Sequence, residues 1–512
     1  MTRRVDGTGR RGWVGPTPLI GILLVGISLV AAALAARVTF GLDGWLWNLD
    51  LPKIDYPLAV FFHEALARGE LPLWNDRLGL GFPLYAEGQI GAFYPPNWLI
   101  FQLDPLAAMD LTRLLHLALA GVGTGLLALR VSGSRQGALL ASVVAVLGGA
   151  VVAKVEWWNL VAAYGWLPWV LLPLAGRSPP RRGAILTAGL AWGVQALAGH
   201  PNTWLLTGLA AGVLLLRRPL LPAVGRLAVF AAVGVGVGAV QLLPTVLLQL
   251  VSVRAGGLSA DDLFTSAATP FDVLGLGFVN AFIRSSNGSW DFPTTWYPDG
   301  IFALLEAASY VGLPVVGLAG IGLGGRRARR WTVLAGVALA IAVMAAFRPS
   351  WWQVVPVLNG LRSPVRSYLL LTLAIAVLAA IGVGRLGRAP AMRRARRGLL
   401  AMAIVVAAYV VAVVLARSFP SVFDWLLRIS ASHPDATGIE QSHGLAVAAL
   451  TSLWPLGLEL LIAALCVPLF RARRGATTVG AAVLLAMLPL GLLSPSVNPV
   501  RPATDISYAS SS

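Results

Sequence analysis

Two aspartates, Asp50 and Asp55, stand just before a run of apolar residues, in a polar segment rich in aromatic side chains. A carboxylate held beside a hydroxyl group can take its proton while that hydroxyl attacks another centre. Both residues are therefore candidates for a general base. The alternative interpretation is a solvated loop acid or a helix cap.

Three arginines, Arg254, Arg362 and Arg366, lie at the ends of hydrophobic segments. A guanidinium group offers a rigid fork of donors that suits phosphate oxygens, and an unpaired arginine near lipid costs about 2.5–3.5 kcal/mol. These residues are candidates for binding the phosphate of a substrate. The alternative is that they extend to the lipid phosphates at the membrane interface.

Five more residues are candidate substrate ligands. His200 lies between two hydrophobic segments, where a neutral imidazole can bond a substrate hydroxyl or simply stabilise a turn. Glu306 stands six residues into a predicted span, and acids inside a membrane usually face a cavity or a partner. Gln89, Tyr94 and Trp74 come from the polar segment that follows Asp50.

Other polar and aromatic residues have simpler interpretations. Lys154 with Glu156 is typical of an ion pair, and His63 with Glu64 of the polar face of a helix. Several tryptophans collect near span ends, where an aromatic belt explains them, although sugars also stack on indole faces: Trp157, Trp158, Trp166, Trp169, Trp351 and Trp352. The single cysteine, Cys466, lies in an apolar run and predicts core packing.

No zinc, P-loop or DxD motif is present, so the sequence predicts no cofactor and no bound metal. The acidic pair Asp261-Asp262, or scattered acids, leaves a divalent cation open.

The composition is that of a membrane protein, since 57% of the 512 residues are hydrophobic and 12% are charged. A helix needs about 20 apolar residues to cross a hydrocarbon core of about 30 Å. We expect an all-α polytopic membrane protein of about thirteen transmembrane helices, near 18–38, 106–129, 137–153, 160–175, 184–199, 202–216, 227–247, 301–323, 331–347, 367–384, 398–416, 446–470 and 476–494.

A net charge of +17 raises the question of nucleic-acid binding, but the arginines gather in alternate short loops between the spans. Basic flanks are retained in the cytoplasm, so this pattern predicts orientation and argues against a nucleic-acid partner. We expect a cytoplasmic basic tail at 1–17, a transmembrane domain at 18–494, and an extracytoplasmic tail at 495–512. The long polar loops 39–105, 248–300 and 418–445 then lie on the outer face, where the functional groups collect.

The first outer loop contains a short helix. Leu58, Phe61, Phe62, Ala65 and Leu66 recur at helical spacing, and Gly69 ends the pattern. This spacing predicts an amphipathic helix lying on the membrane interface. Glycines and prolines then indicate an ordered but irregular segment up to the second span.

A series of short motifs follows in order along the chain. Asp50 stands seven residues before Pro57, and later motifs are GELPLWN (69–75), GFPLYAEGQ (81–89), FYPPNW (93–98), GWLPWVLLPL (165–174), GHPN (199–202), QLLP (241–244), SVRAG (252–256), YVGLP (310–314), LRSPVRS (361–367) and GVGRL (382–386). In these motifs the chain resembles the YfhO-type family of bacterial membrane glycosyltransferases, within the GT-C superfamily. It departs from the family at Asn202, where members usually carry glutamine.

The resemblance implies transfer of a sugar from a polyprenyl-phosphate donor to a cell-envelope polymer or glycolipid, on the outer face of the bacterial inner membrane. It places the catalytic carboxylate at Asp50, with Asp55 as the close competitor, and direct attack inverts the anomeric centre. A flippase or transporter of lipid-linked saccharide is the alternative, and it should show internal repeats and broken helices at the midplane. A third hypothesis is an accessory protein with a degenerate site.

Overall fold

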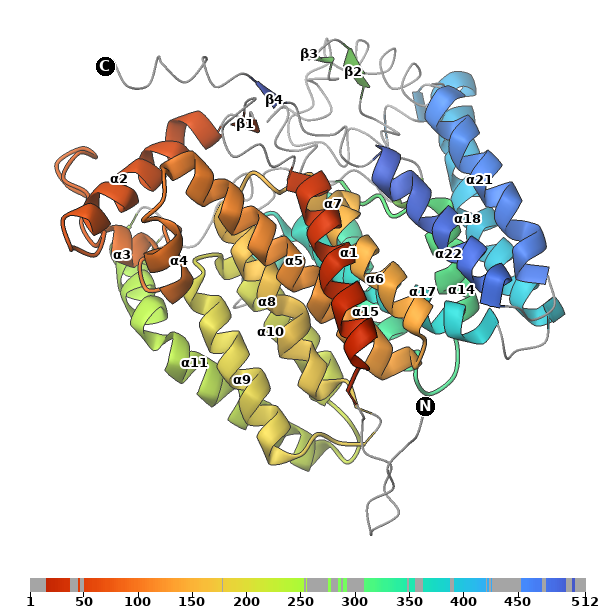
Figure 1. The fold of residues 1–512 in the computed structure, drawn as a ribbon, viewed down its shortest axis with the longest axis horizontal. Coiled ribbons are helices and arrows are strands. Elements are labelled where there is room, and N and C mark those ends of the chain that lie inside the picture. Colours follow the sequence, from red (N-terminus) through yellow and green to blue (C-terminus); the bar gives the residue numbers. More distant parts are fainter. Residues whose placement is uncertain are drawn as a thin grey trace.

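The computed structural model describes residues 15–36, 45–46, 50–176, 178–252, 255, 275–277, 284–286, 289–291, 308–347, 350–354, 362–386, 391–419, 421–422, 425, 453–471, 476–493 and 500–501. Long helices packed side by side form the body of the molecule (Figure 1). They are α1 (Pro18–Ala36), α5 (Pro105–Ser132), α6 (Arg135–Leu147), α8 (Trp158–Leu174), α9 (Arg182–Leu197), α10 (Pro201–Leu215), α11 (Leu220–Val251), α14 (Leu313–Gly322), α15 (Arg329–Ala346), α17 (Tyr368–Leu386), α18 (Ala391–Ser418), α21 (Leu453–Arg471) and α22 (Ala476–Leu493).

Each predicted span contains one of these helices within the described part of the chain. Six helical stretches are long and apolar enough to cross a membrane: Pro18–Ala36, Pro105–Ser132, Arg135–Val152, Leu220–Val251, Pro364–Leu386 and Arg396–Leu415. The prediction of an all-α, multi-pass membrane protein is therefore confirmed, and the helices are compatible with thirteen spans.

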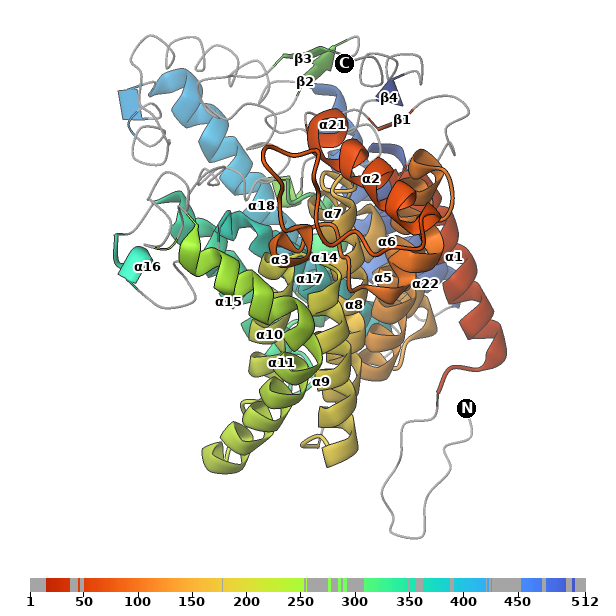
Figure 2. The same ribbon diagram turned by 90° about the vertical axis from the view of Figure 1, so that its left-hand side faces the viewer.

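The first loop forms a set of short elements at the end of the bundle where α1 finishes, which we call the loop end (Figure 1, Figure 2). These are a π-helical turn η1 (Leu51–Asp55), then α2 (Tyr56–Ala67), α3 (Leu84–Glu87) and α4 (Pro95–Ile100). Helix α2 agrees with the predicted amphipathic helix, since Phe61, Phe62 and Ala65 are buried. An isolated bridge between Asn75 and Phe82 closes the segment that follows α2.

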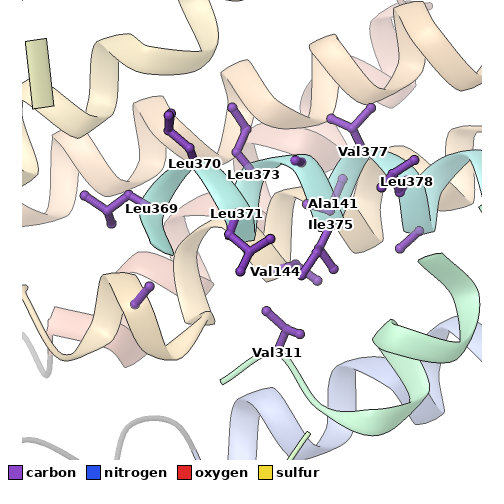
Figure 3. Close-up of a cluster of buried hydrophobic side chains, with 14 of the residues drawn as sticks. Ala141, Val144, Val311, Leu369, Leu370, Leu371, Leu373, Ile375, Val377 and Leu378 are labelled. Carbon is purple, nitrogen blue, oxygen red and sulfur yellow. The ribbon is translucent and has the colours of Figure 1, made fainter. Parts of the chain in front are cut away.

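Helix α17 lies at the centre of the bundle and is buried along almost its whole length. Its leucines and valines meet Ala141 and Val144 of α6, and Val311 before α14 (Figure 3). The backbones of α14 and α17 approach closely, because a Cβ atom on Gly382 would lie 1.9 Å from the carbonyl oxygen of Leu318. Small residues at such crossings let apolar helices pack tightly without a hydrophobic driving force.

A buried carboxylate joins the C-terminal helices to this core. Glu459 of α21 is fully buried and accepts hydrogen bonds from the Tyr310 hydroxyl group and from the backbone N–H of Leu313, the latter at 3.1 Å. Leu313 is the first residue of α14, so the carboxylate satisfies an amide at a helix N-terminus that has no partner within its own helix. Negative charge there also interacts favourably with the helix dipole.

At the opposite end of the bundle, several arginines cap the ends of helices. Arg385 donates to the carbonyl groups of Ile321, Gly322, Leu323 and Gly324 at the end of α14. Arg217 donates to the carbonyl groups of Leu174, the last residue of α8, and of Gly176 and Ser178 just beyond it. These carbonyls lack partners within their own helices, and cations there are stabilised by the helix dipole. The basic loops therefore have a structural role in addition to the predicted topological one.

Four short strands complete the described structure. β1 (Trp45–Leu46) pairs antiparallel with β4 (Val500–Arg501), and β2 (Arg284–Ser286) pairs antiparallel with β3 (Ser289–Asp291). The first pair brings the start of the first loop together with the tail that follows α22.

Candidate functional site

Asp50 lies at the start of the π-helical turn η1, half-buried at the loop end of the bundle. The turn is closed by a hydrogen bond from the Tyr56 N–H to the carbonyl of Leu51, five residues earlier. Asp50 Oδ2 accepts a hydrogen bond of 3.1 Å from the indole Nε1 of Trp157, in the segment that precedes α8. Single π turns often occur at functional sites because they displace a side chain from the regular helical position.

Asp55, at the other end of the same turn, is in a different environment. It is 8% exposed, and its Oδ2 atom has no hydrogen-bond partner. Burial raises the pKa of Asp55 to about 7, and the charges of Asp50 and Glu87 raise it further, whereas Arg113 and the Trp158 indole oppose the rise. The two aspartates therefore differ in their surroundings: Asp50 is half-buried and bonded to Trp157, whereas Asp55 is buried with an unpaired carboxyl oxygen.

Beneath Asp55 lies a buried group of charges that the sequence did not indicate as a unit. Arg113 of α5 is 2% exposed, and its Nη1 donates to Asp110 at 3.1 Å. Its Nη2 donates to the backbone carbonyl of Glu156 at 3.3 Å. Lys154 is fully buried in the same segment. This arginine fastens the segment carrying Trp157 to α5 and sets the electrostatic potential at Asp55.

Arg366 approaches the other side of this site from the short 3₁₀ turn η4 (Pro364–Ser367). Its guanidinium carbon lies 5.9 Å from the centroid of the Trp157 ring. The indole thus contacts the Asp50 carboxylate through its N–H and the Arg366 guanidinium through its face. One tryptophan therefore links the candidate base to a candidate phosphate ligand.

His200 completes the group from the turn between α9 and α10. Arg366 Nη1 donates to His200 Nε2 at 3.2 Å, and His200 Nδ1 lies 2.7 Å from the Thr203 hydroxyl oxygen. The backbone N–H of Thr203 donates to His200 Nδ1 at 3.2 Å, so the histidine caps the N-terminus of α10. Burial, with a further contribution from Arg366, holds the pKa of His200 well below 6.5.

Asn202 fixes the neighbouring segment. Its side-chain amide donates to the backbone carbonyl of Arg362, across 160 residues of sequence. Ser363, which follows, has a φ of 51° and is thus held in the left-handed region, which a non-glycine residue rarely adopts without support. The Arg362 side chain is exposed. The asparagine therefore holds the start of η4, and with it Arg366, against α10.

The structure places the candidates of the first loop in different roles. Tyr94 is 1% exposed. Its hydroxyl oxygen accepts a hydrogen bond of 2.8 Å from the indole Nε1 of Trp166 and lies 2.8 Å from His116 Nε2. Burial raises the pKa of Tyr94 to about 12. Its partners are protein groups, which favours a structural role over the predicted substrate contact.

Two further candidates are exposed to solvent. Gln89 is held by Glu87, which accepts hydrogen bonds from both its backbone and its side-chain N–H groups. Trp74 is 56% exposed and lies on the backbone of Gly81, where a Cβ atom would meet the indole at 2.6 Å. A flat, exposed indole held in this way offers a stacking surface.

Arg254 and Glu306 lie outside the described residues. The structure thus brings together Asp50, Asp55, His200 and Arg366, and joins Arg362 to them through its backbone. It adds Trp157, Arg113 and Asn202, which the sequence analysis did not assign to the site. The sequence contains a signal for two of them: Trp157 is one of two consecutive tryptophans, and Asn202 lies in the motif GHPN at 199–202.

Within the described part of the chain, no group of three His, Cys, Asp or Glu residues is arranged to hold a metal ion.

Comparison with known proteins found no matching family model and no matching curated protein. Among solved structures, the chain is similar to ArnT from Cupriavidus metallidurans bound to undecaprenyl phosphate, with a TM-score of 0.50 and 17% sequence identity over 93% of this chain and 76% of that one. ArnT is a GT-C glycosyltransferase. The chain has the GT-C fold. The apo form of the same ArnT gives a TM-score of 0.45 at 18% identity, again over 93% and 76% of the two chains.

This GT-C fold accounts for the arrangement of the site. The first loop, carrying Asp50, returns to the bundle at α5, and the segment before α8 meets it there. The N-terminus of α10 and the start of η4 contribute the histidine and the arginine from further along the chain. Four separate segments thus meet at the loop end, and the helices hold them in place.

Proposed function

We propose that this protein is an inverting membrane glycosyltransferase of the YfhO type, which uses a polyprenyl-phosphate sugar as donor. The observation that carries the proposal is the connection from Asp50 through Trp157 to Arg366, a carboxylate and a guanidinium group on two sides of one indole. A transferase of this class needs a base for the acceptor and a cation for the leaving phosphate, and this pair supports the proposal because it supplies one candidate for each.

In the proposed reaction, a hydroxyl oxygen of the acceptor attacks the anomeric carbon while its proton moves to Asp50. The bond between that carbon and the phosphate oxygen breaks, and the polyprenyl phosphate leaves with the electron pair. Attack from the face opposite to the phosphate inverts the anomeric centre. Asp50 is preferred to Asp55 as the base because Asp55 is buried, at 8% exposed, whereas Asp50 is half-buried and linked through Trp157 to Arg366.

Arg366 is the proposed partner of the leaving phosphate, with Arg362 and Arg254 as further candidates. The guanidinium group of Arg366 neutralises the negative charge that grows on the phosphate as the bond to the sugar breaks. The similarity to an ArnT structure that holds undecaprenyl phosphate supports a lipid-linked donor. Glu306, Gln89 and Trp74 are the remaining proposed contacts to sugar or acceptor.

We infer the orientation of the protein in the membrane from the distribution of arginines along the sequence. With the N-terminus in the cytoplasm, the loop end of the bundle lies on the outer face of the bacterial inner membrane. A lipid-linked sugar then meets the site from the outer leaflet. The proposed acceptor is a cell-envelope polymer or glycolipid.

Reconstituted protein in lipid nanodiscs tests the proposal directly. The protein is incubated with polyprenyl-phosphate hexoses and an envelope extract, and the transfer of labelled sugar to the extract is measured. Wild type should transfer, Asp50→Asn should not, and Asp76→Asn, which alters an exposed loop acid, should behave as wild type. Equal transfer by Asp50→Asn and wild type contradicts the assigned base. If labelled donor instead moves across proteoliposome membranes without transfer, the protein is a flippase.

A further inference from the structure

Three arginines meet around Gly176, which lies just beyond α8 at the end of the bundle opposite the loop end. Helices α9 and α11 begin at this end, away from α2 (Figure 2). Arg217 Nη2 and Arg330 Nη1 both donate to the Gly176 carbonyl, at 3.1 and 3.4 Å. Arg130 Nη2 lies 3.6 Å from the position that a Cβ atom on Gly176 would take. The last turn of α5, the end of α10 and the first turn of α15 therefore bring positive charge to one point.

Arg226 of α11 adds a fourth positive charge to this group. Burial lowers the pKa of Arg217 to about 10, and the charges of Arg330 and Arg226 contribute to the decrease. Like charges disfavour the charged form of a group when they lie close to it. We call these four residues the arginine cluster: Arg130, Arg217, Arg226 and Arg330.

The segments that form the arginine cluster contain no carboxylate. The sequence has no aspartate or glutamate from 111 to 155, from 157 to 260 or from 307 to 423. These ranges include both the four arginines and the loops and helix ends beside them. Positive charge therefore accumulates here without an acidic residue from the same segments to offset it.

Helix capping and membrane orientation explain only part of this arrangement. Arg217 is a cap, because its Nε and both terminal nitrogens donate to carbonyl groups at the ends of α10 and α8. Orientation requires basic residues in the loops, but it does not require their side chains to meet. Guanidinium groups that gather in a half-buried position repel one another more strongly than they do in water. A bound anion would remove this repulsion.

Exposed apolar side chains border the cluster and indicate which kind of anion fits. Leu216, directly before Arg217, is 49% exposed. On the first turns of α11, Leu220 is 61%, Leu221 84% and Val224 53% exposed. A free phosphate would contact only the arginines. A phospholipid would place its phosphate among the guanidinium groups and its acyl chains against these apolar residues.

We propose that the arginine cluster binds the phosphate of an anionic phospholipid in the leaflet at this end of the bundle. Basic pockets between membrane helices are suited to such headgroups. A zwitterionic headgroup is a poorer ligand, because its ammonium group is repelled by the same arginines. The site lies at the opposite end of the bundle from Asp50, and the proposal does not rest on the proposed function.

The test measures lipid binding to the purified full-length protein in a mild detergent. Native mass spectrometry counts the lipids bound as phosphatidylglycerol, which is anionic, or phosphatidylcholine, which is zwitterionic, is added. The first phosphatidylglycerol should bind to wild type about tenfold more tightly than the first phosphatidylcholine, or more. This comparison needs no variant, so it tests the proposal even if a substitution prevents folding.

Two double variants with the same change in net charge separate the cluster from general electrostatic attraction. Arg226→Gln with Arg330→Gln should weaken phosphatidylglycerol binding about tenfold or more, since each arginine near an anionic headgroup contributes a factor of about five. Arg217 is left in place because it caps two helices. The control is Arg135→Gln with Arg326→Gln, which alters two exposed arginines at the same end of the bundle and should bind as wild type does.

Three results would overturn the proposal. Equal affinity of wild type for the two lipids would show that the cluster does not select an anionic headgroup. Equal losses in the two double variants would show that net charge, rather than the cluster, attracts the lipid. Displacement of phosphatidylglycerol by millimolar inorganic phosphate would identify a site for a free anion instead of a lipid. A preference for phosphatidylglycerol that only the cluster variant loses, and that inorganic phosphate does not abolish, would support the proposal.

Discussion

Arg366 and His200 are 166 residues apart in the sequence, yet Arg366 Nη1 lies 3.2 Å from His200 Nε2. The same guanidinium group lies 5.9 Å from the Trp157 ring, whose N–H is bonded to Asp50. A single line of contacts therefore runs from the turn before α10 to the first loop. Substitutions along this line should have effects that differ in kind, since we propose that Asp50 takes the acceptor proton and that Arg366 binds the donor phosphate.

Replacement of the proposed base should abolish transfer while donor binding persists. Asp50→Asn keeps the size of the side chain and an acceptor for the Trp157 N–H, but it cannot take a proton. The turnover number should fall by about 10²–10⁴-fold, the usual contribution of a general base. Single-turnover assays with labelled donor measure the fall, and a phosphodiester binding assay should give a dissociation constant close to that of wild type. A variant that loses binding and turnover equally would contradict a role in proton transfer.

The helices could be predicted from the sequence because a span needs about 20 apolar residues and its flanks carry charge. The helix of the first loop, at Tyr56–Ala67, could be predicted because burial of one face imposes a helical period. The orientation in the membrane stays a prediction.

The site could be predicted only in part. Asp50, His200 and Arg366 could be proposed for the site because they are polar residues that lie next to predicted spans. The contacts between these residues could not be predicted, because the pairing of His200 with Arg366 depends on how α10 packs beside η4. Arg113 was missed because a single arginine in an apolar helix carries no spacing signal, and its partner atom in Glu156 is a backbone carbonyl. Tyr94 was assigned to substrate, whereas its hydroxyl contacts Trp166 and His116.

The two arginines of η4 and its flank should differ in their effect on donor affinity. Arg366→Lys keeps the charge but loses the planar group that contacts both Trp157 and His200. We expect a donor dissociation constant at least about tenfold higher, the equivalent of 1.4 kcal/mol and typical for one charge-assisted hydrogen bond. Arg362→Lys alters an exposed side chain and should change affinity less. Equal losses in the two variants would place the phosphate elsewhere.

Asp55 should make the stability of the protein depend on pH. Its pKa is raised from 3.8 to about 7, so the folded state binds more protons than the unfolded state between these values. Stability is therefore fully present at low pH and is lost as the pH rises through about 7. The whole effect is on the order of 4 kcal/mol. Asp55→Asn removes the charge and should raise the melting temperature in detergent clearly more at about pH 8 than at about pH 4, because the unfolded carboxyl ionises above 3.8. An equal change at both pH values would show that Asp55 does not titrate in this range.

The arginine caps should contribute to folding independently of the site. Arg385→Met removes the donor that serves four carbonyl groups at the C-terminal end of α14, and we expect a loss of about 1–2 kcal/mol. The matched control is Arg326→Met, which removes an exposed arginine from the same end of the bundle. Thermal unfolding in detergent compares the two variants. A similar change in both would mean that net charge, rather than capping, determines the effect.

Glu459 should hold the C-terminal helices on the core. Glu459→Ala leaves the Tyr310 hydroxyl group and the Leu313 N–H without their acceptors in a buried environment, which costs about 1–3 kcal/mol for each group. Glu459→Gln retains one carbonyl oxygen and should lose less stability. Glu70→Gln is the control, since Glu70 pairs with Arg68 at the exposed surface and should have little effect. Thermal unfolding combined with limited proteolysis measures whether α21 detaches before the rest of the bundle unfolds. If Glu459→Ala unfolds at the wild-type temperature with an unchanged cleavage pattern, the carboxylate does not join α21 to α14.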